Sequence, residues 1–150
     1  MNATVEATAL TAFRRLAVKR GLLPGVLHGQ RHADFVVVMA AAVQSLVRER
    51  EYTESEVNEQ LKAFLAGAGA MLATDHVELR RWLVDSGLVE RDGFGRRYVR
   101  ADAPESFAAA AAGLCDADLA AIARDACTAD ARARALRKAR WIATQDGTRQ

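Results

Sequence analysis

Two helical segments followed by a hairpin signal, between residues 52 and 100, constrain the fold of this 150-residue chain more than any other feature. Thr53 and Glu56 form a capping box at the start of the first helix, because at this spacing each side chain can accept the other residue's backbone N–H. The second helix is followed by Gly87, a residue type that commonly ends helices in the left-handed conformation. Asp92-Gly93 then favours a hairpin. Helix, turn, helix and hairpin is the order of elements in a winged helix.

Apolar residues around this segment repeat at the spacing of helices that bury one face. In the first helix they are Val57, Leu61, Phe64 and Leu65. Upstream, residues 33–50 are apolar on nearly every side, which predicts a helix buried at the centre of the fold. Phe94 and Gly95 follow the hairpin signal, so we expect a loop longer than two residues.

The second helix, capped by Thr74 or Asp75, corresponds to the element that enters the major groove in a DNA-reading winged helix. Leu79 and Leu83 lie on its core side. Its opposite face carries Thr74, Val77, Glu78, Arg81 and Asp85. Because carboxylates repel phosphates, we expect little direct reading of the major groove by this helix alone.

The hairpin is richer in cations than the helix. Strand alternation places Arg96, Tyr98 and Arg100 on one face, and Arg97 and Val99 on the other. The candidate nucleic-acid-binding residues are Arg81, Arg91, Arg96, Arg97 and Arg100. They predict a weak contact with double-stranded DNA, made mainly by the wing. The alternative is a solvated hairpin whose arginines form cross-strand ion pairs.

Polar residues of the two helices also have a structural interpretation. Arg80 or Arg81 is expected to reach Glu56 or Glu59 on the preceding helix and to hold the two helices together. Asn58 either forms a hydrogen bond between the helices or faces solvent.

The residues that carry a family resemblance are Tyr52-Thr53-Glu54, Glu56-Val57-Asn58, Leu61, Asp75, Leu79-Arg80-Arg81, Leu83-Val84-Asp85, Gly87-Leu88, Arg91, Gly93 and Tyr98. In this order they resemble the bacterial domain-of-unknown-function family 2087, a winged-helix-like module found alone or fused to regulators of the arsenic-repressor type. The resemblance implies a winged-helix fold, a link to transcriptional regulation and no catalytic residues. Its structural motif consists of Tyr52, Thr53, Glu56, Asn58, Asp75, Arg80 and Asp85.

Helical extensions are expected on both sides of this segment. Residues 4–20 form an amphipathic pattern, and three helices are predicted after residue 103, starting near Pro104, at Asp116 or Asp118, and at Thr128. We predict a mainly α protein whose winged-helix-like core has three helices and a β-hairpin wing. The expected division is 1–25 for the N-terminal helix and turn, 26–103 for the winged-helix-like domain and 104–150 for the C-terminal helical extension.

Several function classes are disfavoured. The longest nearly apolar run, residues 35–47, is too short to span a bilayer, and no secretory signal is evident. Cys115 and Cys127 are spaced unlike redox or zinc motifs, so we expect reduced thiols in a cytoplasmic protein, with a disulfide as the alternative. His28 and His32 have a metal-compatible spacing if they are helical, but nearby glycines favour a loop or a helix start. We predict a non-enzymatic protein with no catalytic residues, metal or cofactor.

The net charge of +2 is unevenly distributed. Residues 1–31 and 128–150 each carry about four net positive charges, so the middle of the chain is acidic. The basic ends are expected to meet nucleic acid, the chain's own acidic middle or that of a second copy. The last helix has a narrow apolar face made of Ala131, Ala135, Leu136, Ala139 and Ile142. These observations predict a homodimer through the terminal helices.

Two functions are consistent with these features. The first is a DNA-associated transcriptional regulatory protein. The second is a protein-interaction or dimerisation module that keeps the winged-helix scaffold and does not bind DNA. A fold alone does not choose between them.

Overall fold

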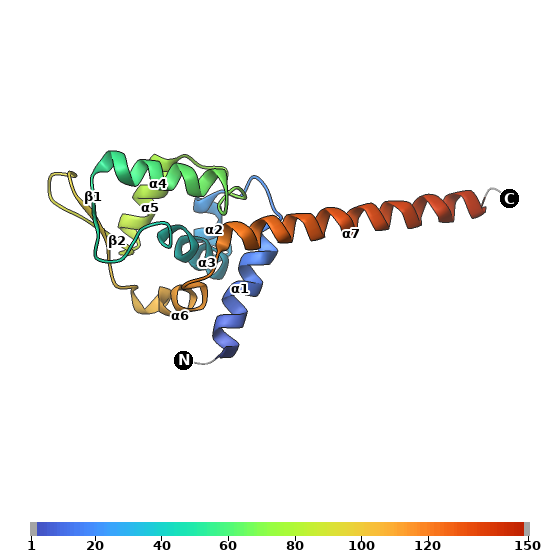
Figure 1. The fold of residues 1–150 in the computed structure, drawn as a ribbon, viewed down its shortest axis with the longest axis horizontal. Coiled ribbons are helices and arrows are strands. Elements are labelled where there is room, and N and C mark those ends of the chain that lie inside the picture. The colour runs from blue at the N-terminus through green and yellow to red at the C-terminus, as the bar shows by residue number, and fades with distance from the viewer. Residues whose placement is uncertain (1–2, 149–150) are drawn as a thin grey trace.

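Figure 1 shows the computed structural model, which describes the backbone of residues 3–148 and the side chains of residues 8–147. The elements are α1 (Ala3–Ala17), α2 (Pro24–Gln30), α3 (His32–Val43), β1 (Glu51–Tyr52), α4 (Glu54–Ala66), α5 (His76–Asp85), β2 (Val89–Arg91), β3 (Tyr98–Arg100), α6 (Glu105–Leu114) and α7 (Leu119–Thr148). The protein is mainly helical, as predicted.

The elements from α3 to β3 confirm the winged-helix-like core. Their order is helix, strand, two helices and two strands, and the three strands form an antiparallel sheet in the order β1-β3-β2. Tyr52 in β1 pairs with Tyr98 in β3, and Glu90 in β2 pairs with Val99. The short strand β1 was not predicted. Because it pairs with β3, the wing belongs to a three-stranded sheet rather than to an isolated hairpin. The connection between β2 and β3 spans residues 92–97 and is longer than two residues, as expected.

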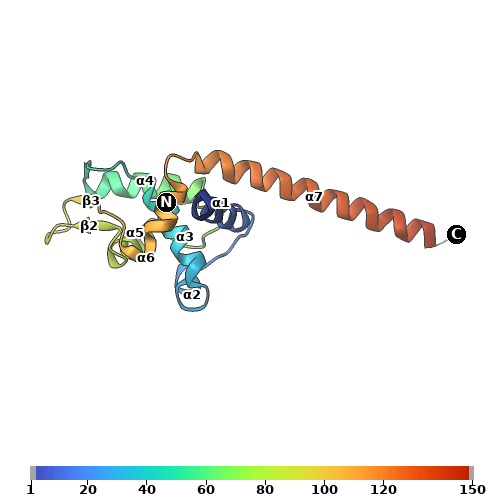
Figure 2. The same cartoon turned by 90° about the horizontal axis from the view of Figure 1, so that it is seen from below.

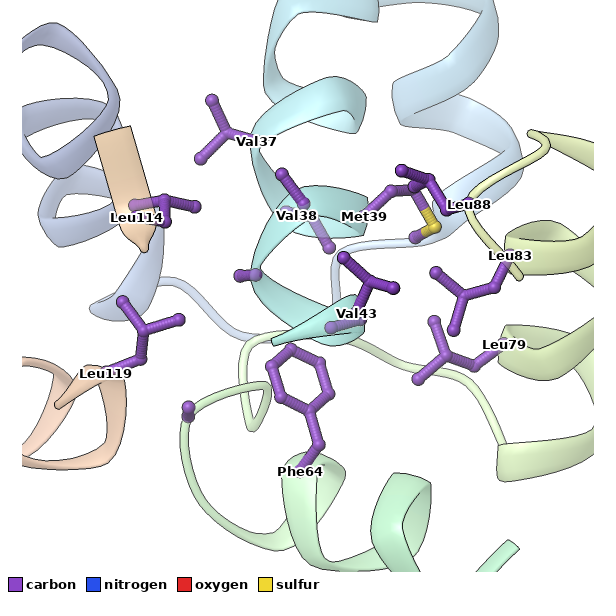
Figure 3. Packing of buried hydrophobic residues seen from close by; sticks show 14 of the residues in the cluster. Val37, Val38, Met39, Val43, Phe64, Leu79, Leu83, Leu88, Leu114 and Leu119 are labelled. Atoms are coloured by element: carbon purple, nitrogen blue, oxygen red, sulfur yellow. The ribbon is translucent and has the colours of Figure 1, made fainter. Parts of the chain in front are cut away.

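Helix α3 lies at the centre of the core. Met39 and Val43 point toward Leu79 and Leu83 of α5, and the Phe64 ring of α4 lies below them (Figure 3). Met39 and Leu79 are fully buried, and Val43 and Leu83 are 1% exposed. The predicted helical phases of α4 and α5 are therefore confirmed at their core positions.

The prediction that this helix continues to Arg50 was wrong, because α3 ends at Val43. Ser45 satisfies a carbonyl group at the C-terminal end of the helix. Its N–H and its hydroxyl both donate to the carbonyl oxygen of Ala42, at 3.1 and 2.6 Å. Leu46 then reaches the core from a turn. Glu49, with a φ of 67°, redirects the chain into β1.

The two histidines lie in different helices, because Arg31 between them has a non-helical backbone with a φ of −137°, and the expected helix start is found at His32. His28 lies in α2 and His32 begins α3. Their rings make a T-shaped contact, with centroids 5.4 Å apart, and both also contact the Phe35 ring. Within residues 3–148, no three His, Cys, Asp or Glu side chains gather as metal ligands.

The N-terminal helix and α6 belong to the same hydrophobic core as the winged-helix elements. Phe13 of α1 and Leu114 of α6 are fully buried, and Phe107 of α6 is 5% exposed. Arg15 of α1 also forms an ion pair with Asp34 of α3, with 2.5 Å between Nη2 and Oδ1. Removing either extension would therefore expose part of the central core.

The C-terminal region differs from the prediction of three helices. After residue 103 the described residues form α6 and one continuous 30-residue helix, α7. Asp118 caps α7 by accepting the N–H of Ala121 at 3.1 Å. Thr128 starts no new helix, because α7 runs through this position without a break. Its hydroxyl donates to the carbonyl oxygen of Arg124 at 3.0 Å, within the same helix. The distal half of α7 leaves the core and projects away from the wing, as both views show (Figures 1 and 2).

The structure also describes the two cysteines and the hydropathy of the helices. Cys115 and Cys127 are both free thiols. In the part of the chain that the structure describes, no single helix has the length and hydropathy to cross a membrane, and α6 and α7 reach them only as a pair bent by 74°.

Candidate nucleic-acid interface

Helix α5 presents a polar face to solvent because its apolar stripe, made of Leu79 and Leu83, is buried. A residue at each end also fixes where the helix starts and stops. Asp75 caps the helix by accepting the N–H of Glu78 at 2.8 Å. Gly87, with a φ of 78°, follows its C-terminal end. The stripe is buried against α3, so Val77, Glu78, Arg81 and Asp85 remain on the exposed side, as predicted.

Arg80 joins α5 to α4, but not through the predicted carboxylates. Its guanidinium donates to Asn58 Oδ1 at 2.5 Å and pairs with Glu54 Oε1 at 3.2 Å. The same group lies over the Tyr98 ring, 5.6 Å from its centroid. Asn58 is therefore a hydrogen-bonding residue between the helices, one of the two roles considered for it.

The predicted partners of Arg80, Glu56 and Glu59, are occupied elsewhere. Glu56 accepts the Thr53 N–H at 3.0 Å and pairs with Arg50 at 3.2 Å, while Glu59 pairs with Lys62 at 3.4 Å. The Glu56 N–H donates in turn to Thr53 Oγ1 at 3.2 Å, which completes the capping box. Hydrogen bonds from Thr53 lower the pKa of Glu56, because they favour the ionised carboxylate.

The predicted face of Arg96, Tyr98 and Arg100 forms only in part. Arg96 precedes β3 and lies in the loop, and Tyr98 is only 2% exposed, so its ring is part of the core. Arg100 turns inward, where Nη1 donates to the carbonyl oxygen of Leu46 at 3.2 Å. Tyr98 and Arg100 do lie on one face of β3, as the strand alternation predicts. This face is directed toward the interior of the protein rather than toward solvent.

Arg97 and Arg96 lie on the exposed part of the wing. Arg97 pairs with Glu51 of β1 at 3.5 Å, so it does form an ion pair, but with a strand outside the hairpin in which such pairs were expected. Arg96 lies beside Phe94, with 5.9 Å between its Cζ and the ring centroid. Its N–H donates to Asp92 Oδ1 at 2.8 Å, and this bond is the largest cause of the lowered pKa of Asp92.

Phe94 was not singled out from the sequence, although it is 85% exposed. Its position between two glycines in a predicted hairpin loop was the available signal, because an aromatic side chain there has no neighbours to cover it. With Arg96 it forms an aromatic and cationic pair in the loop of the wing.

The structure brings Arg81 and Arg91 together. They line one cleft of about 320 Å³ between α5 and the wing, with Asp85 and the aliphatic side chains of Val77 and Val84. Among the described side chains, neither Arg81 nor Arg91 takes part in an ion pair. Two of the five candidate arginines thus share a site, while Arg100 lies in a different part of the molecule.

These features define a winged-helix-like domain with a cationic cleft between its second motif helix and its wing. Residues 29–100 match the family described as "Uncharacterized protein conserved in bacteria (DUF2087)". This segment is similar to the family over 72 of the 150 residues, and it contains every element from α3 to β3. No curated protein and no solved structure matches the chain.

Proposed function

We propose that this chain is a non-enzymatic, cytoplasmic, DNA-associated transcriptional regulatory protein whose α5–wing cleft contacts the phosphate backbone. The observation that carries the proposal is the position of Arg81 and Arg91, which come from different elements, line the same cleft and form no ion pair among the described side chains, although Asp85 also lines the cleft. Guanidinium groups bind phosphate through paired hydrogen bonds, so two of them in one cleft suit a phosphate group.

The wing supplies further contacts. Arg96 forms no ion pair within the described part of the chain, and the Arg97–Glu51 pair joins two well-exposed side chains. An exposed ion pair is worth about 0–1 kcal/mol, so Arg97 can exchange its carboxylate for a phosphate at little cost. Glu78 and Asp85 on α5 oppose close approach of its centre to DNA. The proposed contact is therefore directed at the backbone, weak and independent of sequence.

The test measures binding to mixed-sequence duplex DNA by fluorescence anisotropy at increasing salt concentrations. Binding is expected at micromolar or higher concentrations and to fade as salt rises. The double change Arg81→Gln/Arg91→Gln should weaken binding on every duplex and reduce the slope of affinity against salt. Arg14→Gln/Lys62→Gln removes the same charge elsewhere and is the matched control. Equal effects of the two pairs, or no binding at low salt, would refute the proposed interface.

A dimerisation module is the second candidate, and the projecting half of α7 favours it. Leu136, Trp141 and Ile142 are 59%, 63% and 44% exposed, on a stretch that extends from the core. Most helical stability in proteins comes from packing, so an unpacked stretch of this length gains from a partner. The basic residues of α7 suit the acidic middle of a second copy of the chain.

Light scattering on the full-length protein tests this candidate. A dimer is expected at tens of micromolar, and Leu136→Gln/Trp141→Gln/Ile142→Gln should convert it to a monomer. The control is Leu23→Gln/Val26→Gln, which changes exposed apolar residues away from α7. A monomeric parent protein would exclude a dimerisation role and leave the DNA proposal unaffected.

A further inference from the structure

A separate cavity of about 500 Å³ lies where the turn after α3, the end of β3 and the turn between α6 and α7 meet. Its lining includes Arg48, Arg100, Cys115, Asp116 and Asp118. The volume falls within the range of about 300–1,000 Å³ that is typical of small-molecule sites. The cavity shares no lining residue with the α5–wing cleft.

Arg100 is partly buried at the wall of this cavity. Its guanidinium donates to the carbonyl oxygen of Leu46, and no described carboxylate pairs with it. Burial lowers the pKa of Arg100 most, and the positive charge of Arg48 lowers it further, while the Cys115 thiol acts in the opposite direction. A guanidinium has five N–H donors, so most of its binding capacity remains free.

Arg48 lies in the turn that follows α3, and its charge also has no ion-pair partner among the described side chains. Two carboxylates also line the cavity and oppose an anion, but neither forms an ion pair with an arginine among the described side chains. Asp118 accepts the N–H of Ala121 and caps α7, and Asp116 forms no ion pair with any side chain that the structure describes. Two like charges thus face one cavity, and an anion placed between them would relieve their repulsion.

We propose that Arg48 and Arg100 bind a small oxyanion, a phosphate or a carboxylate, in this cavity. The planar guanidinium groups offer paired N–H donors that match the oxygens of either group. The site joins the last residue of β3 to the turn that precedes α7, so an occupied site holds the wing and the C-terminal helix to the same ligand. The proposal does not depend on DNA binding.

Isothermal titration calorimetry of the full chain with sodium phosphate, and separately with sodium succinate, tests the site at constant ionic strength. Saturable binding of at least one of them is expected, and the arm that binds identifies the chemistry. Arg48→Gln should weaken binding about tenfold or more, since a charged hydrogen bond is lost. Asp116→Asn should strengthen it, because a negative charge leaves the cavity wall.

The controls separate this site from general charge effects. Arg14→Gln removes an exposed cation elsewhere and should leave binding unchanged. Arg48 is preferred to Arg100 as the test position, because Arg100 also holds the Leu46 carbonyl and its loss affects folding. The absence of saturable binding at millimolar phosphate and succinate, or equal binding by the parent protein and Arg48→Gln, would overturn the proposal.

Discussion

Replacing Leu83 with Ala should remove a central contact between α5 and α3. Leu83 is 1% exposed and points toward Met39 and Val43 of α3, beside Leu79 on its own helix (Figure 3). The change deletes buried methyl groups and leaves a cavity between well-packed helices. Neighbouring side chains can collapse into it only in part, because both helices are held at their ends by caps and turns.

The expected loss of unfolding free energy is about 2–5 kcal/mol, the range for Leu→Ala at buried sites. A loss of about 3 kcal/mol is a large fraction of the roughly 5–15 kcal/mol typical of a domain. For a chain of this length it lowers Tm by about 6–12 °C. Leu23→Ala is the matched control, because the same atoms are removed from a side chain that is 50% exposed.

Urea unfolding followed by circular dichroism gives the free energy directly. The midpoint should fall for Leu83→Ala while the slope against denaturant stays the same, which marks a change in stability rather than in compactness. Leu23→Ala should change the free energy by less than about 1 kcal/mol. A loss below 1 kcal/mol at Leu83, or equal losses at both positions, would refute the packing argument.

Three further changes test local features of the same domain. Thr53→Ala should destabilise the protein by about 0.5–2 kcal/mol through the lost cap. The variant keeps the Thr53 backbone N–H, whose hydrogen bond is the largest cause of the lowered pKa of Glu56, so the stability lost as the pH falls through that folded-state pKa should remain in the variant. Arg80→Ala should cost about 1.5–3 kcal/mol in urea unfolding, since its partners on α4 are left unpaired, whereas Arg81→Ala should change stability by less than about 0.5 kcal/mol. Gly69→Ala would place a Cβ 2.2 Å from a phenylalanine ring of α4, and thermal melting should show a loss of about 1–3 kcal/mol.

The elements that were predicted correctly depend on neighbours in the sequence. The capping box of Thr53 and Glu56 lies within one turn, and so does the Asp75 cap of α5. The periodicity that placed Leu61 and Leu83 in the core spans only a few turns of each helix. Local patterns of this kind predict structure without reference to distant parts of the chain.

The elements that were missed depend on partners far away in the chain. Strand β1 is two residues long and exists because Tyr52 pairs with Tyr98. The end of α3 follows from the turn that lets Leu46 enter the core. Thr128 is a residue type that often caps helices. Because it lies inside α7, its hydroxyl instead donates to the carbonyl oxygen of Arg124, one turn earlier.

The candidate site shows the same division. The amino-acid sequence by itself determined the winged-helix order, the two motif helices with their buried faces, and the set of arginines near the wing. Only the tertiary structure decided which arginines are free: Arg80 is held by Glu54, Arg100 turns inward, and Arg81 and Arg91 share a cleft. The physical reason is that a charged side chain takes the partner within its reach in space, and that partner is set by how the helices and the sheet pack.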